Sequence, residues 1–376
     1  MSMVIGLVIV LGVLIFFHEL GHFLVAKAFG VGVERFSLGF GPKLATKKVG
    51  RTEYCISALP LGGYVKMVGE HPDAEIAQED MEFSFTHKPV GQRMLIVAAG
   101  PVFNFVLCIL IFFGIFTISG NLVLKEPVIG EVRAVTPAMV AGLNSGESPP
   151  QKEQDVSFTP AMLAGLKSGD TIVAANGKSI EKWSEVVDIV SNSGGKPVTL
   201  TLLREGQRLK KTVVPKKETV RDIFGEPHER YLIGISGKAQ KERLNPISAM
   251  GESLSKTYMI IKLTVVSVVK LIQGALSVET LGGPIMIAQM AGQQVQHGAV
   301  NLLSFIALVS VNLGILNLLP VPVLDGGHLM FFSIEAVTGR PVSLRAREIA
   351  TQIGIFLLML LMVFVFYNDI MRIVTE

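Results

Sequence analysis

The residues best suited to chemistry form the sequence HELGH, in which His18, Glu19 and His22 lie inside an apolar stretch near the N-terminus. Residues four apart on an α-helix share one face, so both imidazoles can reach the same metal ion. Glu19 stands beside them and can take a proton from a water molecule. Because ionisable side chains inside a membrane span are costly and usually functional, the pattern predicts a zinc site within the first span.

A catalytic zinc ion takes three protein ligands and keeps one position open. The predicted third ligand is Asp325, which follows the proline-rich sequence NLLPVPVL. Proline cannot continue a helix, so the third span should break just before Asp325 and continue as an extended turn. The first and third spans are predicted to run in the same direction, which would bring Asp325 to the depth of His18. His328 in the same turn is the alternative ligand, and we expect one zinc ion per chain.

Composition predicts that these residues belong to a membrane protein with a sizeable water-exposed part. Of the 376 residues, 49% are hydrophobic and 17% are charged, and the mean hydropathy is +0.51. These values are too apolar for an ordinary soluble protein and too mixed for membrane spans alone. The small formal charge of +3 argues against a nucleic-acid partner. Cys55 and Cys108 indicate neither a disulfide framework nor a cysteine metal site.

Four apolar runs are long enough to cross a bilayer. They occupy about residues 3–25, 94–118, 300–320 and 349–367. A fifth run, about 257–278, is interrupted by lysines and is better interpreted as a helix lying at the membrane interface. Basic residues concentrate in the loops after the first and third spans. Both loops should therefore face the cytoplasm, and both chain termini should face the other side.

Two regions have patterns typical of β-structure. FSLGFGPKL (36–44) and YCISALPLGGYVKM (54–67) alternate like hairpin strands bounded by glycine and proline. The region 125–220 contains short strands and one helical stretch, EKWSEVVDIVSNS, as in a small soluble domain. It also carries two copies of TPAMxAGL, which begin at Thr136 and Thr159 and which we interpret as a duplicated loop.

The motifs as a set resemble the site-2 protease family of intramembrane zinc metalloproteases, peptidase family M50. The sequences that carry the resemblance are HELGH in the first span, GPVFNF at 100–105 and NLLPVPVLDGG at 317–327. GFGPKL, LPLGGYVKM and the late YNDIMR make the chain most similar to the bacterial regulator-of-sigma-E protease branch. The resemblance covers nearly the whole chain.

The resemblance implies an activity and the residues that carry it. His18, His22 and Asp325 correspond to the zinc ligands, Glu19 to the catalytic acid/base, and Asn317 to a substrate-contacting asparagine. The implied substrates are single-span membrane proteins, such as an anti-sigma factor or signal-peptide remnants. The implied location is the bacterial inner membrane, where the lipid bilayer surrounds the protein and the active site lies toward the cytoplasm.

A substrate helix must be unwound before cleavage, and its backbone then needs new hydrogen-bond partners because lipid offers none. Gly62, Gly63 and Tyr64 are predicted to supply them by adding the substrate to a strand edge. Asn104 in the second span is better interpreted as a helix-packing residue. The run AGLKSGDTIVAANG resembles a PDZ domain, which binds extended peptide ends. We expect this domain in the periplasm.

The expected fold is a mainly α-helical polytopic membrane protein with four transmembrane helices, membrane-associated β-hairpins and an inserted α/β PDZ domain. The expected parts are a first membrane part (1–124), the PDZ domain (125–220), membrane-surface amphipathic helices (221–299) and a second membrane part (300–376). Two non-enzymatic alternatives are a membrane-anchored PDZ adaptor and a metal transporter. An adaptor has no reason to keep the HELGH residues and Asp325 together. A transporter should spread polar residues along several spans.

Overall fold

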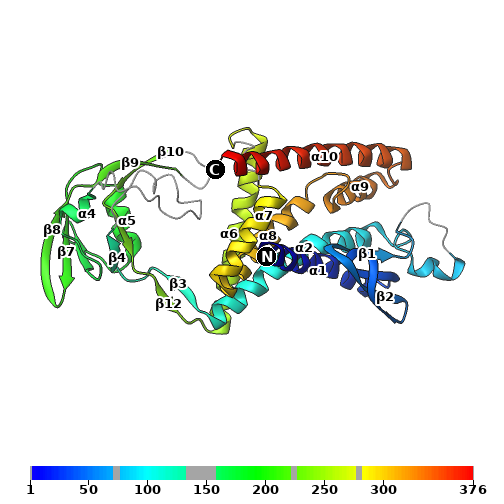
Figure 1. Ribbon diagram of the computed structural model, residues 1–376, viewed down its shortest axis with the longest axis horizontal. Helices are drawn as coiled ribbons and strands as arrows, with labels where there is room; N and C mark the ends of the chain where they lie inside the picture. The colour runs from blue at the N-terminus through cyan, green and yellow to red at the C-terminus, as the bar shows by residue number, and fades with distance from the viewer. Residues whose placement is uncertain (1, 71–76, 133–157, 222–226, 277–281, 376) are drawn as a thin grey trace. The chain divides into compact units, whose positions relative to one another are not determined.

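The computed structural model describes residues 2–70, 77–132, 158–221, 227–276 and 282–375. These residues form two compact units. Unit 1 combines Met1–Ile118 with Asn245–Glu376, and unit 2 is Ser119–Leu244 (Figure 1). Unit 2 is longer than the 125–220 region that the sequence suggested, because the strands after residue 215 pair within it.

Unit 1 is built on long apolar helices. Among the described residues, four are long and apolar enough to cross a membrane. They are α1 (Ser2–Ala28), α2 (Val90–Ile118), α8 (Ala299–Asn317) and α10 (Leu344–Thr375). The structure is mainly helical, and the number of helices able to span a membrane agrees with the four predicted spans.

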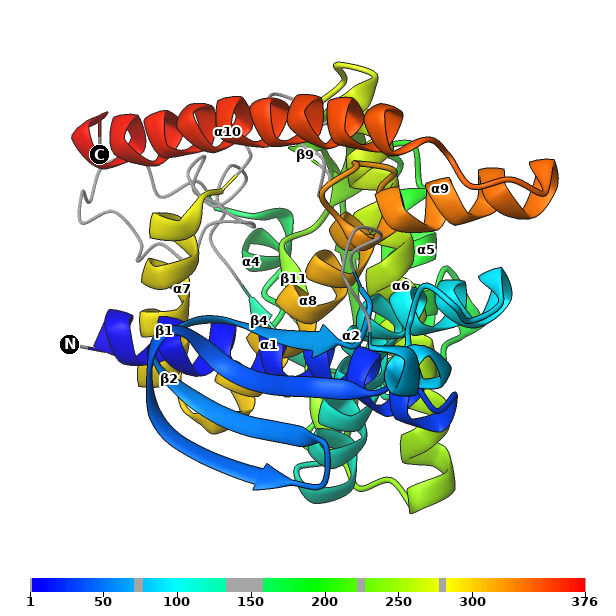
Figure 2. The ribbon, with the colours of Figure 1, turned by 90° about the vertical axis from the view of Figure 1, so that its right-hand side faces the viewer.

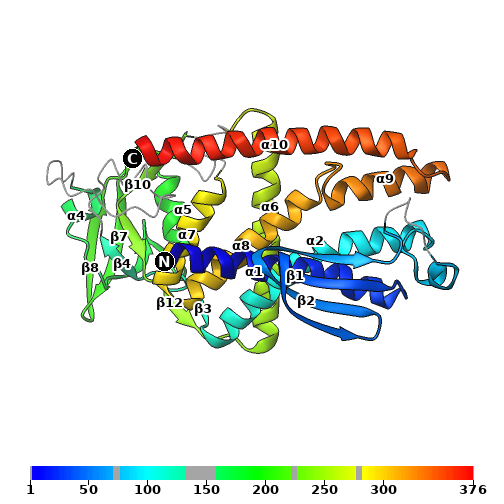
Figure 3. The same cartoon turned by 45° about the vertical axis from the view of Figure 1, so that its right-hand side comes forward.

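The described residues of unit 1 also form three further α-helices, namely α6 (Pro246–Ile272), α7 (Pro284–His297) and α9 (Asp325–Thr338), and a short 3₁₀ helix, η1 (Gln78–Phe83). The lysines of α6 lower its hydropathy, and it is not among the four spanning candidates. Its axis runs across α1 and α10 instead of alongside them (Figures 1 and 3). The sequence predicted only an extended turn where α9 lies, and this helix is a correction.

The contact between α1 and α2 is close because small residues face each other. A Cβ on Gly21 of α1 would lie 2.3 Å from the carbonyl oxygen of Ala99 on α2. Gly314 of α8 similarly faces the carbonyl of Pro101 and the ring of Phe105. Small residues let helix backbones approach in a membrane, where dispersion and hydrogen bonds drive association. These contacts hold α1 and α8 closely against α2.

The two predicted glycine-rich strands are present as β1 (Val33–Val49) and β2 (Thr52–Met67). The first half of β1 pairs on both sides, since Phe36 is opposite both Val65 and Tyr54. The second half of β1 then pairs with the first half of β2, so the two bent strands form a curled sheet (Figure 2). Gly39 and Gly41 have positive φ at the bend of β1, a conformation that glycine adopts without strain.

One face of this sheet packs on α1. Phe36 makes edge-on ring contacts with Phe16 and Phe23 of α1. The second half of β2, Gly62–Met67, lies at one side of the sheet and crosses α1 near Glu19. No other strand of the described residues pairs with its outer edge.

Unit 2 contains an antiparallel sheet in the order β6–β5–β7–β8. Its strands are β5 (Thr171–Ala175), β6 (Lys178–Ser179), β7 (Val198–Arg204) and β8 (Gln207–Val213). The predicted helix is α5 (Trp183–Ser191), whose apolar side packs on Ile172, Leu200 and Leu202 of the sheet. The short helix α4 (Pro160–Leu163) is N-capped by Thr159, the first residue of the second TPAMxAGL copy. The first copy, from Thr136, lies outside the described residues.

The described part of unit 2 also contains three two-stranded ribbons. They pair β3 (Asn121–Val123) with β12 (Gln240–Glu242), β4 (Ile129–Val132) with β11 (Ile235–Gly237), and β9 (Lys216–Arg221) with β10 (Pro227–Leu232). The first ribbon joins the point where the chain enters the unit to the point where it leaves.

Candidate active site

The structure brings the three predicted ligands together. His18 and His22 are buried on one face of α1, and their Nε2 atoms lie 3.2 Å apart. Asp325 Oδ2 lies 3.1 Å from His18 Nε2, and Asp325 Oδ1 lies 3.6 Å from His22 Nε2. One ligand atom from each residue therefore fits within a 4.8 Å cluster. His328 lines the same cavity but is exposed and is not a member of this cluster.

The donor set fits a zinc ion. Two imidazole nitrogens and one carboxylate oxygen are ligands that zinc prefers, and three of them leave a fourth position open. Asp325 Oδ2 is buried and accepts no hydrogen bond from the described residues. A buried carboxylate oxygen without such a partner is unfavourable unless a cation compensates it. The arrangement is therefore suited to a metal and poorly suited to an empty structural role.

The sequence around Asp325 explains how it reaches the histidines. α8 ends at Asn317, and the chain then turns through residues 318–324 before α9 begins at Asp325. A Cβ on Gly326 would lie 2.2 Å from the carbonyl oxygen of Leu319. One on Gly327 would lie 2.3 Å from the carbonyl of Val321. Only glycine allows this turn to fold back so closely that Asp325 faces α1.

An ion pair holds α9 against α2. Arg93 Nη2 donates to Glu335 Oε1 at 2.5 Å, and Arg93 Nη1 donates to Glu335 Oε2 at 3.3 Å. Both side chains are largely buried, with exposed fractions of 11% and 15%. The Arg93 guanidinium also lies over the ring of Phe332. Because α9 begins at Asp325, this bidentate contact fixes the helix that carries the third ligand.

Glu19 lies between the metal cluster and the sheet. The backbone amide of Val65 hydrogen-bonds to the Glu19 carboxylate. A Cβ on Gly63 would lie 3.4 Å from Glu19 Cγ and 2.8 Å from the carbonyl oxygen of Ser37. The glycine thus lets the second half of β2 pass directly over the carboxylate. Glu19, His18 and His22 line one cavity of about 720 Å³ together with Asp325.

The predicted substrate-binding residues differ in where they lie. Tyr64 lines the cavity. Gly62 has the ring of Phe40 stacked directly against it, because its Cβ position would lie 1.9 Å from Phe40 Cε2. Asn317 is half-buried at the end of α8 and is not among the residues that line the cavity.

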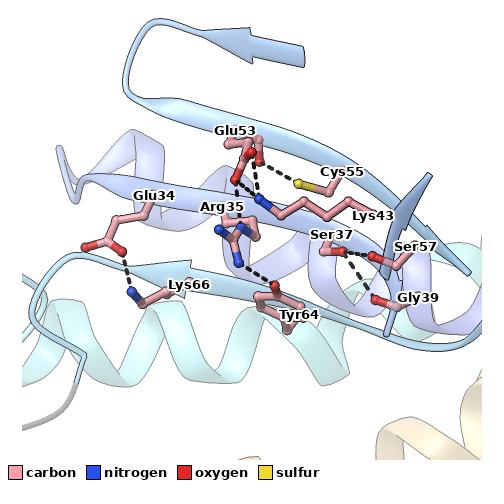
Figure 4. Close-up of polar contacts among 10 residues, drawn as sticks. All are labelled: Glu34, Arg35, Ser37, Gly39, Lys43, Glu53, Cys55, Ser57, Tyr64 and Lys66. Carbon is pink, nitrogen blue, oxygen red and sulfur yellow. Dashed lines mark hydrogen bonds and ion pairs between the residues drawn. The ribbon is translucent and has the colours of Figure 1, made fainter. Parts of the chain in front are cut away.

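A polar network behind β2 supports Tyr64 (Figure 4). Arg35 Nη1 donates to the Tyr64 hydroxyl at 3.0 Å, and Arg35 Nε donates to Glu53 at 2.9 Å. Lys43 Nζ donates to both Glu53 oxygens at 2.8 Å. The hydrogen bonds from Lys43 and Arg35 lower the pKa of Glu53, so this carboxylate stays ionised. The ring of Tyr64 stacks on Phe40 and is held at the rim of the cavity.

The second span makes contacts with both histidines that the sequence did not predict. His22 Nδ1 lies 2.9 Å from the carbonyl oxygen of Ile96, and His18 Nδ1 lies 3.1 Å from the side chain of Asn104. A Cβ on Gly100 would lie 2.3 Å from His22 Nε2. The GPVFN sequence carried the signal, since a glycine followed four residues later by a polar residue marks one helix face.

Comparison with known proteins is consistent with these features. The family model described as Peptidase family M50 matches residues 6–361. A protein of Agrobacterium fabrum named as a zinc metalloprotease is 36% identical over 98% of this chain and 95% of its own length. The regulator of sigma-E protease RseP of Escherichia coli is 36% identical over 97% of each chain. Its counterpart in Yersinia pestis, named protease RseP, is 35% identical over 97% of each chain.

Proposed function

Because the chain belongs to peptidase family M50, we propose that it is an intramembrane zinc metalloprotease of the site-2 type. It hydrolyses peptide bonds within the transmembrane segments of single-span membrane proteins. The observation that carries the proposal is the cluster of His18, His22 and Asp325, which forms on α1, a helix apolar enough to span a membrane, and has Glu19 beside it. Zinc is the metal named in several relatives, and one ion per chain matches the single cluster of the described residues.

Each site residue has a distinct task in this proposal. His18, His22 and Asp325 hold the zinc ion, which when bound acts as a Lewis acid toward the scissile carbonyl. Glu19 takes a proton from the attacking water and then delivers it to the leaving amine nitrogen. The amide of Val65 orients the Glu19 carboxylate for both transfers. The turn at Gly326 keeps Asp325 facing the two histidines while the substrate enters.

The outer edge of β2 is the proposed substrate-binding strand. It lies beside Glu19 and is free of strand partners among the described residues. An extended substrate added there would satisfy its own backbone groups, which lipid cannot do. Gly62 and Gly63 let this part of β2 pass close to Phe40 and Glu19, and Tyr64 contacts the substrate side chain from the cavity rim. Asn317 would bind the substrate segment farther from the metal.

Unit 2 is proposed to be a PDZ domain on the extracytoplasmic side. A shallow groove of about 130 Å³ lies between α5 and the segment that joins β10 to β11. Its lining is mainly apolar and includes Trp183, Val186, Val190, Leu232, Ile233 and Ile235. A strand-to-helix groove of this kind suits an extended peptide end. The domain would admit trimmed substrates and exclude intact proteins with large outer domains.

The proposed location is the bacterial inner membrane, with the active site toward the cytoplasm. Positive-inside logic supports this orientation, because basic residues gather at the same ends of α1 and α10. Lys27 lies in the last turn of α1, Lys47 and Lys48 follow it, and Arg345 and Arg347 lie in the first turn of α10. The regulatory name of the Escherichia coli relative suggests an anti-sigma factor as one substrate class, with signal-peptide remnants as another.

The decisive experiment compares membrane proteomes of cells that express the active chain or Glu19→Gln. Single-span proteins should accumulate only with the variant, and a purified model substrate should be cut within its apolar segment. Cleavage confined to soluble segments would refute the intramembrane assignment. A form without unit 2 should stay active but cut substrates with large outer domains as fast as trimmed ones. Unchanged discrimination would refute the role given to the PDZ domain.

A further inference from the structure

Asn104 is a wholly buried side chain that the chemistry above does not use. It lies on α2 with an exposed fraction of 0%, and its Nδ2 is 3.1 Å from His18 Nδ1. Its other terminal atom, Oδ1, is buried without a hydrogen-bond partner among the described residues. Only one end of this amide has a hydrogen-bond partner, so the end that faces His18 must be identified from the chemistry of the ring.

The ring tautomer of His18 determines which end of this amide should face the ring. Its Nε2 faces His22 and Asp325, so Nε2 must keep its lone pair if His18 is to hold a metal. Nδ1 then carries the ring proton and needs an acceptor. A carboxamide oxygen is an acceptor, whereas a carboxamide nitrogen is not. Since the two ends of an asparagine amide are exchanged by a half-turn, Oδ1 of Asn104 can accept this proton at the position observed for Nδ2.

The neighbouring histidine shows the same arrangement. His22 also directs Nε2 toward the cluster, and its Nδ1 lies 2.9 Å from the carbonyl oxygen of Ile96. Ile96, Gly100 and Asn104 are four residues apart, so they lie on one face of α2. The glycine leaves room for both rings, because a Cβ there would lie 2.8 Å from His18 Cε1. This single face of α2 therefore provides one acceptor to each histidine.

The backbone of Asn104 is itself fixed by a third helix. Ser310 of α8, also wholly buried, donates its hydroxyl to the Asn104 carbonyl oxygen at 2.8 Å. The contact holds the side chain at a constant height relative to His18. A packing role alone would be met by a partner on a neighbouring helix, as in the bond from Thr264 Oγ1 to Asn312 Oδ1 at 2.8 Å. Asn104 instead turns its amide to a predicted metal ligand.

We propose that Asn104 is a positioning residue that accepts the Nδ1 proton of His18 and so fixes the tautomer and ring orientation needed to bind the metal. The proposal rests on the metal site proposed above. Partners of this kind, which hold a ligating histidine from behind, typically contribute 10- to 100-fold to metal affinity. Asn104 is therefore more than the packing residue that the sequence suggested.

The test is a Zn²⁺ titration of the purified full chain in detergent, in competition with a chelating indicator. Asn104→Leu keeps the side-chain volume but removes the acceptor, and should weaken Zn²⁺ binding about 10- to 100-fold. Asn104→Asp retains an acceptor and should bind nearly as tightly as the wild type. Asn312→Leu is the matched control, because it removes a half-buried, hydrogen-bonded amide from α8 and should leave the affinity unchanged.

Absorption of the Co²⁺-substituted protein provides a second readout. The visible bands should change in Asn104→Leu and should be restored in Asn104→Asp. Equal Zn²⁺ affinity in the wild type and Asn104→Leu would overturn the proposal, as would equal losses in Asn104→Leu and Asn312→Leu. If Asn104→Leu does not fold, Asn104→Asp provides the test. Weak Zn²⁺ binding by Asn104→Asp would then overturn the proposal. Failure of the wild type to bind Zn²⁺ would instead refute the proposed function.

Discussion

Two aspartates, one in each unit, contrast a carboxylate that is fully paired within the protein with one that lies at the proposed metal site. In unit 2, Asp170 is 1% exposed and Arg204 donates to both of its oxygens at 2.7 and 2.8 Å. The backbone amide of Lys167 adds a third bond at 2.8 Å. In unit 1, Asp325 faces two imidazoles, and its Oδ2 accepts no hydrogen bond from the described residues.

The difference indicates what each site needs. The charge of Asp170 is compensated within the protein, so its environment is complete once unit 2 has folded. The charge of Asp325 is left partly uncompensated by protein groups, and a bound cation would complete it. A buried acidic group with a full set of donors is typical of a structural role, whereas an incomplete set marks a site for a ligand.

The largest effect that this comparison predicts follows Asp325→Ala. Loss of one of three ligands should abolish cleavage and lower zinc affinity by at least about 100-fold. That factor is the upper end of the effect of removing a residue that only hydrogen-bonds a metal ligand. Metal analysis of the purified protein and hydrolysis of a single-span substrate measure the two effects. His328→Ala should retain zinc. If zinc is lost from His328→Ala and kept by Asp325→Ala, His328 is the third ligand.

Glu19→Gln should remove catalysis and keep the metal, because all three ligands remain. Loss of a general acid/base is expected to lower the cleavage rate by about 10²- to 10⁴-fold. Zinc content and single-turnover hydrolysis should be measured on the same preparation. Cleavage at near the wild-type rate would exclude Glu19 as the proton carrier, and loss of zinc would show that it acts as a ligand.

Arg204→Met should destabilise unit 2 without affecting metal binding in unit 1. It leaves the buried Asp170 carboxylate with only the Lys167 amide as a partner, so the urea midpoint of unit 2 should fall well below the wild-type value. The chain has one tryptophan, Trp183, and it lies in the core of unit 2, so its fluorescence reports urea unfolding of this unit. Arg208→Met, which alters an exposed arginine on β8, is the control. Equal midpoints for the two variants would contradict the structural role of Asp170.

The smallest effect is a pH dependence of unit 2. Burial alone would raise the pKa of Asp170, but the hydrogen bonds from Arg204 and the Lys167 amide outweigh it and lower the pKa below its ordinary value. The stabilisation is therefore fully present above the unfolded pKa of about 3.9 and is lost as the pH falls through the lowered native pKa. Urea midpoints from Trp183 fluorescence should fall below pH 4 in the wild type and fall less in Asp170→Asn. Parallel curves would exclude Asp170 as the source.

Some parts of the site could be predicted from the sequence because they depend only on residues close together along the chain. The spacing of His18 and His22 needs only the period of a helix, and the apolar runs need only their length. Asp325 could be predicted as a ligand because prolines mark the break before it and the charge distribution sets the direction of the spans.

The remaining parts depend on contacts that no local pattern encodes. Arg93 and Glu335 are 242 positions apart, and each alone resembles an ordinary charged residue at the end of a helix. Asn104 had two interpretations until its distance to His18 was known. The helix α9 was missed because the prolines and glycines around Asp325 suggested a turn, whereas its apolar residues pack against α2 only in the folded chain.

The ribbon of β3 and β12 bears on how a domain can be inserted into this chain or removed from it. Asn121 pairs with Glu242 and Val123 with Gln240, so entry to and exit from unit 2 lie side by side. The unit is therefore a cassette that can be excised or exchanged without pulling apart α2 and α6, whose ends it joins. An Asn-Gly turn placed between Val123 and Gln240 would close the ribbon as an ordinary hairpin. Cassettes of other sizes could be accepted at the same two strands while the catalytic helices keep their arrangement.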